Sequence, residues 1–236
     1  MPPTTDPSSW STAGYEHLTV EALPDPDGGA GRVAVVTLHL PERRNMMSEQ
    51  MTASWVRAMA ALAEDAELRA VVVTGTPPAF CSGGDTSWIG AESHLGIEGL
   101  RARMARFYRA WMSIADLRVP TIAAVNGAAI GAGLALAMAC DIRYVADDAT
   151  LAAPFTRLGM HPGMLTTWSI TRAASLAVAR DLLLTGRSVL GPEAVALGLA
   201  SRSLPAAEVL PAALEAATAV ARAAPLATRL TKQALA

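Results

Sequence analysis

Short apolar runs alternate with amphipathic segments along most of this chain. Runs rich in β-branched residues predict strands, and apolar positions that recur at intervals of three and four predict helices. The expected strands are residues 15–23, 32–40, 70–74, 121–125 and 141–146. The expected helices are a segment capped by Ser48, residues 97–117 and the run that ends at Cys140.

The alternation of strands and helices predicts the α/β fold class, with right-handed βαβ units around a core sheet. From residue 173 onward the chain is rich in Ala and predicts helices. We therefore divide the chain into a core domain, residues 15–172, and a helical C-terminal region, residues 173–236. Residues 1–14 are rich in Pro, Ser and Thr and predict a disordered tail.

The composition narrows the classes of protein and partner. With 19 basic and 21 acidic side chains the net charge is −2, so nucleic acid is not an expected partner. Two cysteines form no disulfide framework and no secretory signal begins the chain, which together predict a cytoplasmic protein. Residues 121–140 approach the length of a membrane span. Asn126 and three glycines interrupt them, so we expect a buried strand, turn and helix and no membrane span.

Two glycine-rich turns follow apolar strands, at residues 79–85 (AFCSGGD) and 126–133 (NGAAIGAG). Small residues let a ligand approach the backbone, and the first N–H groups of a helix have no intrahelical acceptor. Two such N–H groups that converge on one point would stabilise an oxyanion. Two other interpretations stay open, namely tight turns without a binding role and a dinucleotide site at Gly131-x-Gly133, where Leu136 takes the third small position.

Motifs for two other chemistries are missing from the sequence. No G-x-S-x-G elbow supports a serine hydrolase, and the cysteines and histidines do not have the spacing of zinc ligands. We therefore expect no metal site.

Six segments follow one another along most of the chain, namely PERRN (41–45), VVVTGTPPAFCSGGD (71–85), PTIAAVNGAAIGAGLALAMACDIRYVADDA (120–149), LGMHPG (158–163), LLLTGRSVLGPEAVALGLA (182–200) and APLATRLTKQAL (224–235). In this order and spacing they resemble the enoyl-CoA hydratase/isomerase (crotonase) superfamily. The resemblance implies a crotonase-like spiral of ββα units that associates with itself as a homotrimer or hexamer. It implies lyase or isomerase chemistry of fatty acid metabolism on an acyl-CoA thioester, with no cofactor beyond the coenzyme A that belongs to the substrate. Its oxyanion-hole N–H groups would be those of Gly84 and Ala132.

The chain departs from that family at both acid positions. Hydratases of the family carry glutamates where this chain has Ala135 and Phe155, so ordinary hydration of an enoyl-CoA is not expected. His161 is the first candidate for a replacement acid or base and Asp85 the second. Each has a structural alternative, which is hydrogen bonding within its loop for His161 and turn capping or pairing with an arginine for Asp85.

Further residues are candidates for contact with the ligand, and Arg43 and Arg44 are the expected partners of the CoA phosphates. The full set is Arg43, Arg44, Met46, Ser82, Gly83, Gly131, Phe155 and Arg157. By contrast, the arginines of the helix at residues 97–117 predict a solvated or subunit-facing surface. Two other functions stay open, a non-catalytic acyl-CoA carrier or sensor and an accessory subunit of a hetero-oligomer. Members of the family usually continue beyond Leu235 for another helix or two that close the acyl pocket.

Overall fold

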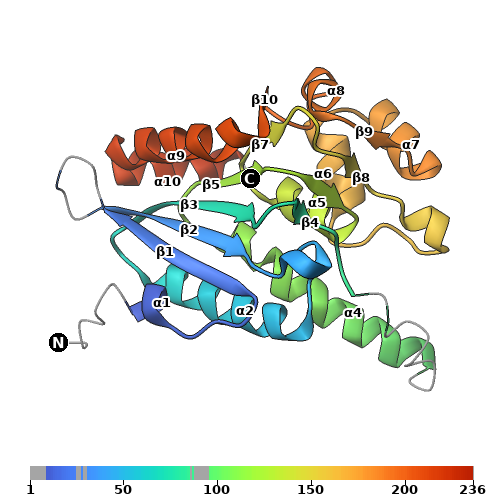
Figure 1. Ribbon diagram of the computed structural model, residues 1–236, viewed down its shortest axis with the longest axis horizontal. Helices are drawn as coiled ribbons and strands as arrows, with labels where there is room; N and C mark the ends of the chain where they lie inside the picture. Colours follow the sequence, from blue (N-terminus) through green and yellow to red (C-terminus); the bar gives the residue numbers. More distant parts are fainter. Residues whose placement is uncertain (1–8, 25–27, 29–30, 86, 88–95, 236) are drawn as a thin grey trace.

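A computed structural model describes residues 9–24, 28, 31–85, 87 and 96–235, and its centre is a six-stranded sheet. The strand order is β1-β2-β3-β5-β7-β10 (Figure 1). β1 and β2 form an antiparallel hairpin, and the remaining neighbours pair in parallel. The bounds are Leu18–Pro24, Arg32–Leu38, Leu68–Gly75, Thr121–Val125, Ile142–Ala146 and Arg202–Leu204.

A second sheet of four short strands has the order β4-β6-β8-β9. Its strands are Ala79–Cys81, Ala128–Ile130, Leu151–Ala152 and Ser188–Val189. Each of β3, β5 and β7 in the large sheet is followed along the chain by β4, β6 or β8 in the small one. A helix then leads back to the next strand of the large sheet after the first two pairs. These repeated ββα units confirm the expected spiral.

Helices cover the sheets on several sides. α2 (Glu49–Glu64) and α4 (Gly96–Met112) lie below the six-stranded sheet in Figure 1, and α9 (Ala206–Arg222) lies above it. α5 (Ala132–Ala139) is buried almost all round, since only Ala139 is not fully buried. The other helices are α1 (Ser9–Thr12), α6 (Thr166–Ala173), α7 (Leu176–Thr185), α8 (Gly191–Ala196) and α10 (Pro225–Leu235). Short 3-10 helices are η1 (Pro41–Arg43), η3 (Ser113–Asp116) and η4 (Phe155–Leu158).

Stacked tryptophans join α2 to α4. The rings of Trp55 and Trp111 have centroids 4.8 Å apart, and the Trp111 indole N–H donates to Thr52 Oγ1 at 3.0 Å. Both tryptophans are fully buried, so burial of their large apolar surface fixes how the two helices pack. On the other face of the sheet, α9 buries Val209, Ala213, Ala217 and Ala221, whose spacing of four puts them on one side of the helix.

The longer helices and strands lie close to where the sequence predicted them. The structure differs from the prediction in three places, at the N-terminus, at the end of one helix and in the C-terminal region. Residues 9–12, expected in the disordered tail, form α1, where the buried Trp10 donates its indole N–H to Asp65 Oδ2 at 3.0 Å; residues 1–8 lie outside the described part. The helix expected at 97–117 ends at Met112 and continues as η3. The C-terminal region is helical but also contributes β9 and β10, one to each sheet.

Two other expectations are confirmed. Ser48 caps α2, since its side chain accepts a hydrogen bond from Met51 N at 3.1 Å. Residues 121–140 form β5, β6 and α5, which are buried strands and a helix. Among the described helices, no single one is long and apolar enough to cross a membrane; α9 and α10 pass that test only as a pair, bent by 115°.

The side chain of Asn45 holds the turn after β2 against the loop before β4. Its Oδ1 accepts from Leu40 N at 2.9 Å, and its Nδ2 donates to Thr76 O and Ala79 O, both at 2.7 Å. The residue is fully buried and has a left-handed φ of 53°. Asparagine suits this place because it tolerates that conformation and supplies both a donor and an acceptor.

We expect Asn45→Ala to lower the free energy of unfolding by about 2–4 kcal/mol, because buried polar groups lose their partners. Urea unfolding followed by circular dichroism measures the change. Asn45→Gly is the matched variant, since it loses the same hydrogen bonds but tolerates the positive φ, and it should be less destabilised than the alanine variant. An Asn45→Ala protein as stable as the wild type would contradict this account.

Candidate active site

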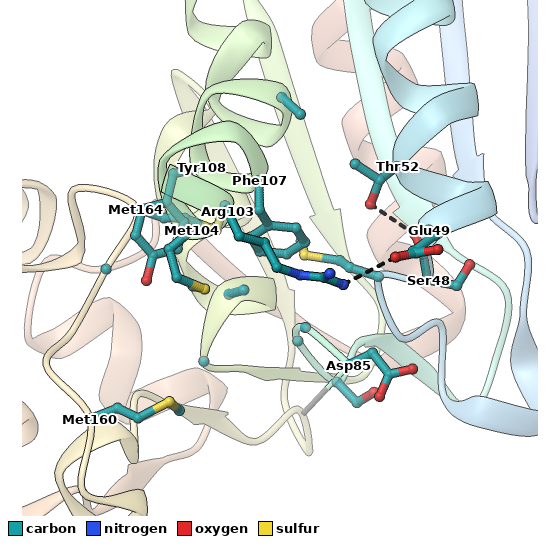
Figure 2. A pocket seen from close by; sticks show the side chains of 18 of the residues that line it. Ser48, Glu49, Thr52, Asp85, Arg103, Met104, Phe107, Tyr108, Met160 and Met164 are labelled. Carbon is teal, nitrogen blue, oxygen red and sulfur yellow. Dashed lines mark hydrogen bonds and ion pairs between the residues drawn. The ribbon is translucent and has the colours of Figure 1, made fainter. Parts of the chain in front are cut away.

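A cavity of about 1130 Å³ opens between the two glycine-rich loops and α4. Its walls come from the start of α2, the loop after β4, the middle of α4, the start of α5 and the segment around η4. Most of the lining surface is apolar, with a few charged side chains (Figure 2). A large, mostly apolar cavity with a small number of polar groups is the usual form of a small-molecule site.

The loop after β4 and the start of α5 approach each other closely. Gly83 has a φ of 97°, and a Cβ there would lie 2.7 Å from Ile130 O and 3.4 Å from Ala132 N. Gly131 has φ 57° and ψ −116°, a conformation that side chains other than hydrogen rarely allow. Glycine at position 83 therefore lets the backbone of one loop lie directly against that of the other, and glycine at position 131 allows the backbone conformation from which α5 begins.

Two backbone N–H groups in this wall have no acceptor among the described residues. Gly84 forms a parallel bridge with Met47 in which Met47 N donates to Gly83 O at 2.9 Å, and this bridge leaves the Gly84 N–H unused. Ala132 is the first residue of α5, where a helix offers no internal acceptor. Both residues line the cavity, so the pair predicted from the sequence is placed together on one wall.

Apolar side chains lie at Ala135 and Phe155, the two positions at which the sequence resemblance predicts the acids of a hydratase. Ala135 is buried one turn into α5, and its N–H donates to Gly131 O at 3.0 Å. Phe155 begins η4 and lines the cavity, with its ring 3.8 Å from the place where a Cβ on Gly131 would lie. The wall beside the two N–H groups is therefore an aromatic ring that transfers no proton.

Asp85 lines the cavity but is held as part of its own turn. Its Oδ1 accepts from Ser87 N at 2.9 Å, and its Oδ2 lies 3.7 Å from the Arg43 guanidinium. Hydrogen bonds from Ser87 hold the pKa of Asp85 below its ordinary value, and the charge of Arg43 adds to the effect. A carboxylate that is ionised and already bound by Ser87 and Arg43 is better suited to capping the turn than to donating a proton.

His161 also lines the cavity, on the loop that follows η4. Its side chain is exposed, and no described residue forms a hydrogen bond with the imidazole. The ring is therefore able to reach a ligand, but no described partner orients it. A general base usually has such a partner.

The other predicted ligand residues divide into two groups. Arg43, Ser82, Gly83 and Gly131 line the cavity together with Phe155. Arg44, Met46 and Arg157 are not among the lining residues, and the Arg157 Nε donates instead to Thr185 O at 3.0 Å. The neighbour Met47 takes the place expected for Met46, because the bridge to Gly84 turns Met47 inward.

Several lining residues were not among the predicted ones. Glu49 at the start of α2 lies 3.0 Å from Arg103 of α4, and this ion pair crosses one side of the cavity in Figure 2. Arg106 also lines the cavity, so the arginines of α4 do not form only a solvated or subunit-facing surface. Met104, Phe107 and Tyr108 complete this wall. Two adjacent aromatic residues in an arginine-rich helix were the one sequence signal for it.

Neither a metal nor a reactive thiol is indicated in the described part of the chain. No group of three or more His, Cys, Asp or Glu side chains there has the arrangement of a metal site. Burial raises the pKa of the Cys81 thiol to about 12, and burial followed by the charge of Asp141 does the same for Cys140. Both cysteines pack as small apolar side chains.

The chain is similar in sequence to proteins of one family. Residues 28–236 match the model of a family described as enoyl-CoA hydratase/isomerase. A probable enoyl-CoA hydratase of Mycobacterium tuberculosis, EchA14, is 43% identical over 169 residues, which are 71% of this chain and 64% of that protein. The chain thus spans slightly less than two thirds of that relative's length.

Solved structures agree with the sequence matches. A probable enoyl-CoA hydratase/isomerase from Mycobacterium abscessus has a TM-score of 0.77 and 38% identity, covering 92% of this chain and 81% of the other. A monofunctional enoyl-CoA isomerase from M. smegmatis has a TM-score of 0.76 and 30% identity, covering 93% and 91%. Proteins described as hydratases and as isomerases therefore share this fold.

We expect both cysteines to resist iodoacetamide at a pH of about 8 while the protein is folded, because the thiolate is the reactive form and burial disfavours it. Mass spectrometry of the intact protein should show no alkylation, and the same reagent in concentrated urea should modify both residues. The denatured sample is the control for reagent activity. Rapid modification of Cys81 in the folded protein would show an accessible thiol in the site.

Proposed function

The chain belongs to the enoyl-CoA hydratase/isomerase family, and on that premise we propose that it binds an acyl-CoA thioester in the cavity, with the thioester carbonyl oxygen at the N–H groups of Gly84 and Ala132. The observation that supports this most directly is the pair of N–H groups on one cavity wall that donate to no acceptor among the described residues. The carbonyl oxygen of a thioester has two lone pairs and accepts from both.

The proposed arrangement favours negative charge on that oxygen. When a proton leaves the carbon next to the thioester, charge moves onto the carbonyl oxygen and forms an enolate. Two fixed donors stabilise that charge, and the N-terminus of α5 adds the positive end of a helix dipole. The Phe155 and Phe107 rings exclude water from this part of the cavity and strengthen the electrostatic interaction.

Positive side chains around the cavity suit the phosphates of coenzyme A. Arg43, Arg103 and Arg106 all line it, and the Arg43 side chain is 55% exposed. Arginine is well suited to phosphate oxygens because its guanidinium presents several donors in a planar fork. Arg44 is also exposed next to Arg43, at the turn that follows η1.

The reaction is proposed to differ from ordinary hydration of an enoyl-CoA. That reaction needs groups that hand protons to and from water, and Ala135 and Phe155 supply none. His161 is the first candidate for a substitute, since it lines the cavity and its imidazole forms no hydrogen bond with the part of the chain that the structure describes. The same lack of acids also favours a second function, in which the protein carries or senses acyl-CoA without turnover, alone or as an accessory subunit.

Self-association is part of the proposal. Large apolar side chains are exposed on α6, α7 and the segments beside them, namely Leu158, Leu165, Trp168, Leu176, Leu184 and Leu190. Burial of such a surface between copies, as a trimer or hexamer, would remove it from water.

We expect Ala132→Pro to weaken acyl-CoA binding by about 1–4 kcal/mol, because proline lacks the N–H that the carbonyl oxygen would accept. Proline is tolerated at the first position of a helix, so α5 should form. Ala132→Ser keeps the N–H and is the matched control. Calorimetric titration with butyryl-CoA and with desulfo-CoA, which has no thioester carbonyl, measures the effect; desulfo-CoA binding should change far less.

Equal affinity of the wild type and Ala132→Pro for butyryl-CoA would remove Ala132 from the proposed site. Gly84→Val tests the other donor in the same titration. A Cβ at Gly84 would lie 3.4 Å from the Phe107 ring, so the larger side chain should also push on that ring and obstruct the approach of the carbonyl.

We expect the hydration of crotonyl-CoA to be several orders of magnitude slower than for a hydratase with both acids, since each positioned acid or base contributes about 10²–10⁴-fold. Loss of the enoyl absorbance measures the rate. The double variant Ala135→Glu, Phe155→Glu should gain a trace of activity, with Ala135→Gln, Phe155→Gln as its uncharged control. Efficient hydration by the unmodified protein would refute this prediction.

A further inference from the structure

Tyr108 places a phenol hydroxyl in the apolar part of the cavity. The residue is half-buried in α4 and lines the cavity beside Phe107, whose ring centroid is 6.1 Å from that of Tyr108. No described residue forms a hydrogen bond with the Tyr108 hydroxyl. Burial raises the pKa of Tyr108, so the hydroxyl is protonated at neutral pH and is able to donate.

Flexible, apolar methionine side chains lie near the hydroxyl. Figure 2 shows Met104, Tyr108 and Met164 gathered on one side of the cavity, across from Glu49 and Asp85. Methionine side chains adapt to chains of different shape, which suits a site for an acyl group. Their thioether sulfurs are only weak hydrogen-bond acceptors, so they do not replace a true partner for the phenol.

The backbone fixes where the ring lies. A Cβ on Gly163 would lie 2.1 Å from the Tyr108 hydroxyl oxygen, so the tyrosine fits only because residue 163 has no side chain. On the preceding residue of α4, Phe107 lies 3.4 Å from the place of a Cβ on Gly84, beside the proposed carbonyl site. Tyr108 itself faces the loop of Gly163, farther from that carbonyl.

A plain hydrocarbon chain in this part of the cavity would displace water from the Tyr108 hydroxyl and would provide no hydrogen-bond acceptor to replace it. A half-buried hydroxyl without a partner loses the hydrogen bond that it makes with water, and this opposes binding of such a chain. An acyl chain that carries an oxygen at the right place restores the bond. Sites with a hydrogen-bonding side chain discriminate strongly against analogues that lack the matching group.

We infer that Tyr108 hydrogen-bonds to an oxygen substituent on the acyl chain, so that the cavity selects hydroxyacyl- or oxoacyl-CoA thioesters over plain hydrocarbon thioesters. This inference rests on the proposed binding of acyl-CoA and names the class of substrate for the same cavity. Tyr108 acts as a specificity-determining residue, apart from the two N–H groups that hold the carbonyl.

Calorimetric titration with hexanoyl-CoA and its 3-hydroxy, 3-oxo and 5-hydroxy derivatives tests the inference. The wild type should bind at least one oxygenated thioester about tenfold more tightly than hexanoyl-CoA, the effect of one additional hydrogen bond. Tyr108→Phe should reduce that preference to about twofold or less, in part by tightening the binding of hexanoyl-CoA, because the phenylalanine ring has no hydroxyl to lose its hydrogen bond with water. Tyr144→Phe is the matched control, because Tyr144 lies in β7 with its ring against Arg202.

Gly163→Ala provides a second variant that keeps the hydroxyl but moves it, and it should lose the preference as Tyr108→Phe does. Circular dichroism checks that each variant is folded. The inference is overturned if the wild type binds no oxygenated thioester more tightly than hexanoyl-CoA, or if Tyr108→Phe keeps the preference. Binding of hexanoyl-CoA without any preference leaves the proposed function standing; binding of no thioester at all overturns both.

Discussion

Direct contact between two pieces of backbone, the loop after β4 and the first turn of α5, is the constraint on which the site depends. A Cβ on Gly133 would lie 2.2 Å from Cys81 O, and one on Gly83 would lie 2.7 Å from Ile130 O. Side chains at these positions would force the small sheet and α5 apart. Because they are absent, two N–H groups from segments far apart in sequence reach one cavity wall.

Other contacts hold this arrangement in place from outside. Asn45 ties the turn after β2 to the loop before β4, and the bridge between Met47 and Gly84 continues that link to the edge of the cavity. Stacking of Trp55 on Trp111 fixes α4 against α2. The walls of the cavity are thus positioned by buried packing and hydrogen-bond contacts, and fixed walls are the condition for donors that need no rearrangement when charge develops.

The family fold does not by itself determine the chemistry of the site. Both a hydratase/isomerase and a monofunctional isomerase share this fold, so the architecture by itself does not select a reaction. In this chain, Phe155 and Ala135 supply no proton and Asp85 is engaged by Ser87 and Arg43. What distinguishes the proposed site is therefore its lining, where the two N–H groups lie beside apolar side chains and the carboxylates of Glu49 and Asp85 are each paired with an arginine.

The sequence by itself determined the long elements, the α/β class and the two glycine loops, because hydrophobic periodicity and glycine in turns are local properties. It missed β4, β6, β8 and β9, whose two or three residues are too short to show a period and whose pairing joins distant segments. It also missed Glu49, Arg103 and Tyr108 as cavity residues. Which face of α4 lines the cavity depends on its packing against α2 and the loop of Gly163, and only the tertiary structure decides that.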